Sequence, residues 1–191
     1  NDSMILKRAA TFLGYKMKDK LSGSDLLPLI CEYSSKKGYS IFFLGAKEGV
    51  AKKACENLTN RFKNLDIVGT YSPPFGFETD KKECQKIINM INSHSPNILF
   101  IGLGAPKQEK FAYKYLEKMN INIILCTGAA FDFQAGNIKR APKYIQRLGM
   151  EWFYRFYKEP KRLFKRYFID DMKFFPIFFK EITRKMEKKE K

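Results

Sequence analysis

Short apolar runs alternate with longer amphipathic stretches through the middle of the chain. Each run carries apolar side chains at successive positions and ends in turn residues, which predicts a buried strand. The predicted strands are residues 39–45, 65–71, 97–104 and 121–128. The stretches between and before the strands have helical spacing, and predict helices at 4–13, 24–37, 47–62, 78–94 and 106–119. Ser22 or Ser24 is suited to cap the second helix.

This alternation predicts an α/β fold, Rossmann-like, with a mostly parallel sheet and helices on both faces. Ligands bind such sheets outside the carboxyl ends of the strands. The expected ends are residues 45–49, 71–77, 102–108 and 127–130. All four contain a glycine, and turns of this kind that open a helix can direct backbone N–H groups toward a phosphate.

The composition changes near residue 140. Residues 151–191 contain 12 of the 29 aromatic residues, and no strand pattern occurs there. At helical spacing the aromatic and aliphatic side chains fall on one side and the basic ones on the other, except that Asp171 interrupts the apolar side and Pro176 would kink a continuous helix. A basic, aromatic amphipathic helix is typical of a segment that lies in a membrane interface. We therefore expect an α/β domain at 1–145 and a helical membrane-association appendage at 146–191.

The formal charge is +16, which predicts an anionic partner: nucleic acid, an acidic membrane surface or a phosphorylated substrate. The four cysteines are scattered and there is one histidine, which favours a reduced, cytosolic protein without a structural zinc site. No apolar run approaches the ~18 residues needed to span a bilayer. A secretory signal peptide is not expected.

The chain lacks the glycine fingerprint of dinucleotide-binding folds and the P-loop motif, and it has no D-x-D pair to clamp a metal-bound diphosphate. Two alternatives remain open alongside an enzyme acting on a nucleotide-linked substrate. The charge and the aromatic residues permit a nucleic-acid-binding module. The type of sheet permits an NAD-dependent oxidoreductase, although the missing fingerprint disfavours it.

Lys107 and Gln108 lie in the first turn of a predicted helix. The helix dipole disfavours a cation there, so Lys107 either serves a function or merely points into water. The neutral amide of Gln108 both donates and accepts, which suits contact with a sugar hydroxyl or amide in the cleft. Asp132 is a candidate acid, or a turn former. The turns containing Gly45, Gly49, Gly104 and Gly128 are candidate nucleotide or sugar sites.

Five segments together resemble the WecG/TagA/CpsF family of bacterial glycosyltransferases, and the resemblance extends from residue 1 to about 170. In chain order they read FFLGAKEGVA, SPPFGF, ILFIGLGAPKQEKF, GAAFDFQAGNIKRAP and LGMEWFYRFYKEPKRL. The resemblance implies an inverting transfer of a sugar, of the N-acetylmannosamine type or related, from a UDP-sugar to a sugar on undecaprenyl diphosphate. It implies synthesis of teichoic acid, capsule or exopolysaccharide by a cytoplasmic protein on the inner face of the cell membrane. No metal or other cofactor is expected.

The resemblance also implies roles for individual residues. Asp2 matches the general base, and Gln108 matches an active-site glutamine. Lys20, near Ser22, stands where the family usually has an arginine, and loses the bidentate fork. Arg155 and Arg162 match cations that reach the UDP diphosphate, with Lys165 or Arg166 as the third.

We expect Pro160 to separate Arg155 and Arg162 onto different helices. The expected partners are a UDP-sugar, the undecaprenyl-linked acceptor and an anionic membrane surface, without nucleic acid. The sequence leaves a homo-oligomer open. The chain begins with Asn1, and an N-terminal segment found in the family is expected to be missing.

Overall fold

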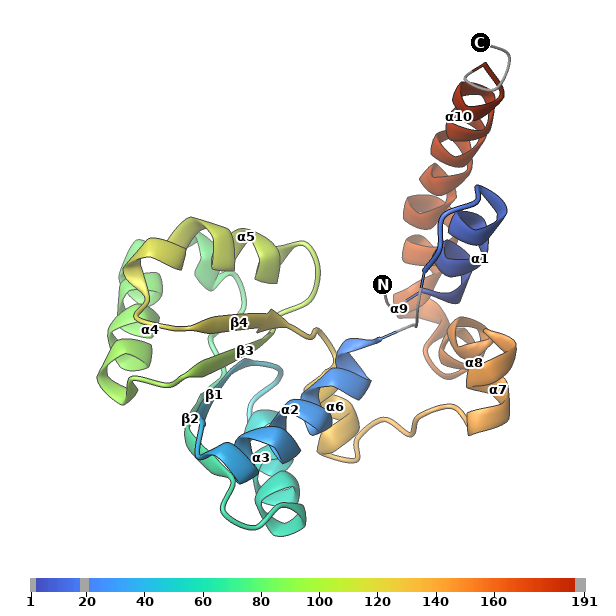
Figure 1. Cartoon of the computed structure of the whole chain (residues 1–191). Coiled ribbons are helices and arrows are strands. Elements are labelled where there is room, and N and C mark those ends of the chain that lie inside the picture. Colours follow the sequence, from blue (N-terminus) through green and yellow to red (C-terminus); the bar gives the residue numbers. More distant parts are fainter. Residues whose placement is uncertain (1–2, 18–20, 188–191) are drawn as a thin grey trace. The chain divides into compact units, whose positions relative to one another are not determined.

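The computed structural model describes residues 3–17 and 21–187, and Figure 1 shows their course. The chain forms two compact units. Leu21–Lys139 form the first, which contains the sheet. Asn1–Lys20 join Arg140–Lys191 in the second, which is helical. The helical unit therefore draws on both ends of the sequence, a grouping that no local pattern indicates.

The sheet has four parallel strands in the order β2-β1-β3-β4. They are β1 (Ser40–Gly45), β2 (Asp66–Tyr71), β3 (Ile98–Gly102) and β4 (Ile123–Cys126). The central strands are buried almost throughout, which explains their continuous apolar sequences. The predicted parallel α/β fold is confirmed.

Helices cover both faces of the sheet (Figure 1). One face is covered by α2 (Gly23–Lys37), α3 (Val50–Arg61) and α6 (Ala130–Gln134), and the other by α4 (Lys81–His94) and α5 (Lys107–Tyr115). Single 3-10 turns occur at Phe77–Thr79 and Leu116–Lys118.

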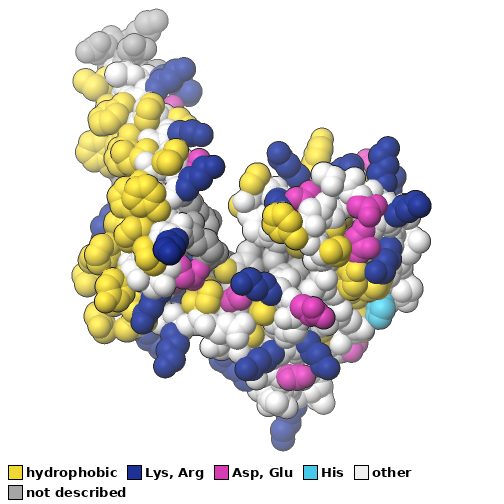
Figure 2. Space-filling model, turned by 180° about the vertical axis from the view of Figure 1, so that it is seen from behind, with side chains coloured by type: hydrophobic (Ala, Val, Ile, Leu, Met, Phe, Trp, Pro, Cys, Tyr) yellow, Lys and Arg dark blue, Asp and Glu magenta, His cyan; other side chains and the backbone are white. Residues whose placement is uncertain are grey.

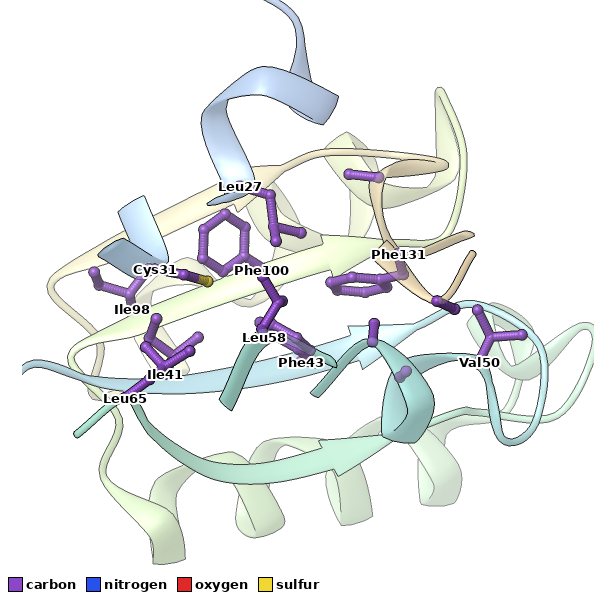
Figure 3. Close-up of a cluster of buried hydrophobic side chains, with 14 residues drawn as sticks. Leu27, Cys31, Ile41, Phe43, Val50, Leu58, Leu65, Ile98, Phe100 and Phe131 are labelled. Atoms are coloured by element: carbon purple, nitrogen blue, oxygen red, sulfur yellow. The ribbon is translucent and has the colours of Figure 1, made fainter. Parts of the chain in front are cut away.

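Alternate residues of each central strand serve alternate cores. Ile41 and Phe43 point toward α2, α3 and α6, as Figure 3 shows. The ring centroids of Phe43 and Phe131 lie 4.7 Å apart. Phe42 and Leu44 belong to the opposite core, against α4 and α5. The two layers of helices thus hold β1 from both faces of the sheet and fix the position of its carboxyl end.

The helix boundaries follow local chemistry. Asp80 caps α4, because its carboxylate accepts hydrogen bonds from the backbone N–H groups of Lys82 and Glu83 at 2.8 and 3.2 Å. The helix predicted at 47–62 begins at Val50 instead, because the preceding Gly49 has φ 77° and cannot belong to a right-handed helix. α2 ends at Lys37, and the Gly38 that follows takes the left-handed conformation that is common after helices.

The helical unit contains α1 (Met4–Phe12), α7 (Lys143–Leu148), α8 (Glu151–Lys158), α9 (Pro160–Lys165) and α10 (Phe174–Glu187). Two single turns, Arg166–Asp170 and Asp171–Lys173, separate α9 from α10. Pro160 begins a new helix, so the predicted separation of Arg155 and Arg162 is confirmed. Pro176 lies in the first turn of α10, where proline is tolerated, and the break in the tail precedes it.

α1 packs beside α10 within this unit (Figure 1). The rings of Phe12 and Phe178 lie 6.0 Å apart, and Tyr15 Oη donates to Glu181 Oε1 at 3.3 Å. Lys185 Nζ donates to the Leu13 carbonyl and lies 4.1 Å from the centre of the Tyr15 ring. In the described part of the chain, no helix has the length and apolarity needed to cross a membrane.

Candidate functional site

The strand order places a topological switch point between β1 and β3. The chain leaves β1 toward β2 on one side, whereas β3 and β4 lie on the other. In an open parallel sheet, the loops diverge at such a point and leave a crevice beyond the carboxyl ends. The turns after Gly45 and Gly102 therefore flank the site that the fold favours.

Close backbone contacts hold these turns together. A Cβ added to Gly45 would lie 2.6 Å from the Gly102 carbonyl oxygen, and one added to Gly102 would lie 2.9 Å from the carbonyl oxygen of Gly128. A Cβ on Gly23, at the start of α2, would lie 2.8 Å from the Thr127 carbonyl oxygen. Only glycine permits backbones to approach this closely. The carboxyl ends of β1, β3 and β4 and the start of α2 thus pack together at the C-terminal end of the sheet. We call this region the packed edge.

The turn from β1 to α3 has an unusual backbone. Gly45, Ala46 and Gly49 have φ values of 115°, 62° and 77°, although alanine rarely adopts a positive φ. Ala46 N donates to the Gly102 carbonyl at 2.8 Å, and Ser72 Oγ donates to the Gly45 carbonyl at 3.2 Å. The predicted glycines Gly45 and Gly49 are therefore at the sheet edge, in a turn braced from two sides.

Gln108 is buried, with 5% of its surface exposed. Its Oε1 accepts a hydrogen bond from Gly128 N at 3.1 Å, and its Nε2 donates to Glu109 Oε1 at 2.8 Å. Gly104 precedes it in a turn with φ 80°, and its carbonyl accepts from Gln108 N at 3.1 Å. The amide therefore braces the turn after β4. The contact of this amide with a sugar stays a prediction. The sequence pattern did not identify Glu109, which accepts a hydrogen bond from the amide.

Lys107, at the first position of α5, has two neighbours from the loop after β2. Its Nζ lies 2.5 Å from Glu78 Oε1 and 4.7 Å from the centroid of the Phe75 ring. The hydrogen bond from Lys107 lowers the pKa of the Glu78 carboxyl group. These contacts explain a cation at a helix N-terminus, because the carboxylate offsets the unfavourable dipole. Sequence reasoning missed both partners, although a Pro-Pro-Phe-Gly loop is itself a signal of rigid presentation.

Other predicted residues lie around the same edge. Ser22 holds the N-cap position of α2, and its Oγ donates to Asp25 Oδ2 at 2.6 Å. Asp132 is half-buried in the first turn of α6, directly after the Gly128 turn. The Thr127 hydroxyl is buried and has no hydrogen-bond partner among the described residues. Sequence reasoning did not identify it as a polar group of this edge.

The remaining predicted residues belong to the helical unit or lie outside the described residues. Arg155 is half-buried on α8. Arg162 lies in α9, and Arg166 begins the turn that follows. Asp2 and Lys20 lie outside the described residues.

The helical unit exposes many large apolar side chains, and Figure 2 shows hydrophobic groups over much of the face in view. Among those at least half exposed are Phe153, Tyr157, Phe164, Ile177 and Phe179. Apolar exposure of this extent marks an interaction surface.

Over residues 3–17 and 21–187, no cluster of three His, Cys, Asp or Glu side chains could hold a metal ion.

Comparison with known proteins gives a match over nearly the whole chain. The glycosyl transferase WecG/TagA/CpsF family model matches residues 1–188. A Bacillus subtilis protein is 33% identical over 147 residues, 77% of this chain and 55% of the relative. A Bacillus spizizenii protein is 29% identical over 161 residues, 84% of this chain and 60% of the relative. Both are named N-acetylglucosaminyldiphosphoundecaprenol N-acetyl-beta-D-mannosaminyltransferase, and the matched region spans little more than half of each.

Proposed function

Because the chain belongs to the WecG/TagA/CpsF family of glycosyltransferases, we propose that it transfers an N-acetylmannosamine-type sugar from a UDP-sugar to a polyprenyl-diphosphate-linked sugar. The names of two relatives support both the sugar and the class of acceptor. The product would enter teichoic acid or another cell-surface polysaccharide. Family membership gives no support to the nucleic-acid-binding or oxidoreductase alternatives.

The packed edge at the switch point carries the proposal for the donor site. The close contacts at Gly45 and Gly102 bring together the turns that contain Gly45, Gly49, Gly104 and Gly128, at the carboxyl ends of three adjacent strands. Backbone N–H groups in such turns bind phosphate oxygens and need no side-chain charge. We assign the UDP-sugar to this edge, with Lys107 as the cation that faces its diphosphate.

Gln108 positions the sugar in this proposal by holding the Gly128 turn in place. Its Oε1 keeps the hydrogen bond to Gly128 N, and one N–H of its Nε2 stays on Glu109 while the other would donate to a sugar hydroxyl. Ser22 and Asp132 lie on the elements that border the same edge and would add hydrogen bonds to the substrate.

The reaction is a single displacement that inverts the anomeric carbon. The base, assigned to Asp2, takes the proton of the acceptor hydroxyl as its oxygen bonds to the anomeric carbon. The bond from that carbon to the diphosphate oxygen breaks at the same time, and UDP leaves with the electron pair. Arg155, Arg162 and Arg166 are assigned to stabilise the charge on UDP, and Lys20 to bind substrate. We propose that these cations replace a metal ion.

We place the protein at the inner face of the cell membrane, as a peripheral protein. The exposed apolar side chains of the helical unit and the basic residues among them support this location. The acceptor is anchored in the same membrane, so binding there would concentrate the enzyme near its substrate.

The direct test measures UDP release by the purified protein with UDP-N-acetylmannosamine and a lipid-diphosphate N-acetylglucosamine acceptor. We expect turnover that persists in EDTA, and a product whose new linkage has the opposite anomeric configuration to the donor. The longer B. subtilis relative is the positive control, and UDP-N-acetylglucosamine is the mismatched donor. Turnover by the relative but none by this chain would contradict the proposal.

A further inference from the structure

The loop that follows β2 and ends in the Phe77–Thr79 turn spans the switch point. At its start, Ser72 Oγ donates to the carbonyls of Gly45 and Lys47, at 3.2 and 3.4 Å, in the turn after β1. Farther along, Glu78 pairs with Lys107, which begins the helix after β3. The loop is therefore tied to the ends of both strands that flank the proposed donor site.

This loop is rigid for local reasons. Pro73 and Pro74 fix φ at two successive positions, and Gly76 takes φ 82°. Phe77 N donates to the Pro74 carbonyl at 3.3 Å. The Phe77 ring is buried and lies 5.5 Å from the Phe111 ring of α5, between centroids. The residue between these anchors is thus held in a fixed place.

That residue is Phe75, and its side chain is fully exposed, with a relative accessibility of 100%. Its neighbour Phe77 shows that the same loop can bury a ring when packing requires it. An exposed ring on a braced loop has no role in the core of this unit. The ammonium of Lys107 lies over the Phe75 ring, 4.7 Å from its centroid.

Resting on the proposed function, we propose that Phe75 is a stacking platform for the pyrimidine base of the donor nucleotide, with Lys107 oriented toward its phosphates. A flat aromatic face binds a base by stacking, without requiring hydrogen bonds from side chains. Lys107 and Glu78 are both partly exposed, at 42% and 34% of their side chains. The ammonium has three donors, so it can bind a phosphate oxygen while Glu78 holds it beside the ring.

The base and the diphosphate of the donor nucleotide would bind different side chains, so different substitutions should weaken the binding of each. Phe75 would bind only the base, whereas Lys107 would bind any diphosphate. UDP carries both groups and inorganic pyrophosphate carries only the second. Tyr113 offers a matched control, because it is an aromatic residue of α5 with 85% exposure.

The test is calorimetric titration of the full chain with UDP, a UDP-sugar and pyrophosphate. We expect Phe75→Ala to weaken UDP binding by about tenfold, the scale of one stacked base, and to leave pyrophosphate binding unchanged. Phe75→Trp should retain UDP binding, and Tyr113→Ala should match the unmodified protein. Lys107→Met should weaken UDP and pyrophosphate alike.

The outcomes separate this inference from the function on which it rests. If the unmodified protein binds UDP and Phe75→Ala binds it equally well, the platform is overturned and the donor proposal survives. If the unmodified protein binds no UDP, the donor proposal is overturned together with the platform. A Phe75→Ala loss for the UDP-sugar alone would assign the ring to the sugar and refute base stacking, as would an equal loss for pyrophosphate.

Discussion

Gln108 Oε1 accepts a hydrogen bond from the backbone N–H of Gly128, and this contact joins the start of α5 to the turn after β4. Glu109 Oε1 fixes the orientation of this amide by accepting a hydrogen bond from its Nε2 atom. Burial protects this arrangement from competing water. Gln108 is thus a structural part of the packed edge, because it connects α5 to the turn after β4.

Replacing Gln108 with alanine should therefore affect both stability and turnover. We expect the free energy of unfolding to fall by about 1–2 kcal/mol, because the Gly128 N–H loses its partner. UDP release should fall by about tenfold or more, since the turn no longer holds its position. Gln85→Ala is the control, because its amide bonds Asn89 on the exposed face of α4. Equal behaviour of the two variants in urea unfolding and turnover would refute the brace.

Alanine at Gly45 should be more disruptive than alanine at Gly49. Both glycines have positive φ, so each substitution introduces backbone strain. Only at Gly45 does the new Cβ meet another backbone, and overpacking there should add about 1–3 kcal/mol of destabilisation. Urea denaturation of the two variants measures the difference directly. Similar midpoints would show that the close approach of β1 and β3 relaxes easily.

Stability should decline at alkaline pH through a buried thiol. Burial, with a smaller contribution from Cys55, raises the pKa of Cys31 from 9.0 to about 12. The unfolded chain then loses this proton first, so stability is complete below about pH 9 and is lost as pH rises toward 12. The loss should be roughly 1.4 kcal/mol per pH unit. Cys31→Ala should show a shallower decline in unfolding free energy, and an identical slope would contradict the assignment.

Lys185 should hold α1 in place within the helical unit. It donates to the Leu13 carbonyl at the end of α1 and lies over the Tyr15 ring. We expect Lys185→Ala to increase amide hydrogen exchange in residues 4–12 by about fivefold, the equivalent of roughly 1 kcal/mol. Lys180→Ala removes the same charge from an exposed position of the same helix. Unchanged exchange, or equal increases in both variants, would rule out the contact.

Two exposed apolar residues of α10 should contribute to membrane binding. Ile177 and Phe179 are 68% and 61% exposed, and replacing both with aspartate adds charge where apolar contact is expected. Flotation with phosphatidylglycerol-containing vesicles should recover about tenfold less of this variant than of the unmodified protein. Tyr113→Asp, on α5 of the sheet unit, should float normally. Full recovery of the double variant would move the membrane-binding surface elsewhere.

The strands and the covering helices could be predicted because their signals are local. Ile41 through Leu44 form an uninterrupted apolar run, which parallel strands require when both faces are buried. The positions of the glycine turns followed from the ends of those runs. Helix starts were less accurate at residues 47–49, because the positive φ of Gly49 ends the turn two residues after Lys47.

Contacts between distant segments left no local signal. The pairing of Lys107 with Glu78 depends on a loop from another strand, and the packing of α1 on α10 joins the two ends of the chain. The inward direction of the Gln108 amide depends on where β4 ends. Periodicity reports which face of an element is buried, whereas these contacts depend on which elements become neighbours.

The glycine contacts at the sheet edge have a consequence for how such a protein can diversify. Gly45 and Gly102 cannot change without displacing a neighbouring main chain, but Lys47 and Ala105, which follow them in the same turns, have exposed side chains. Mutations at these intervening positions would alter what the edge recognises while the scaffold beneath it stays intact. Donor preference would then change without a loss of fold stability.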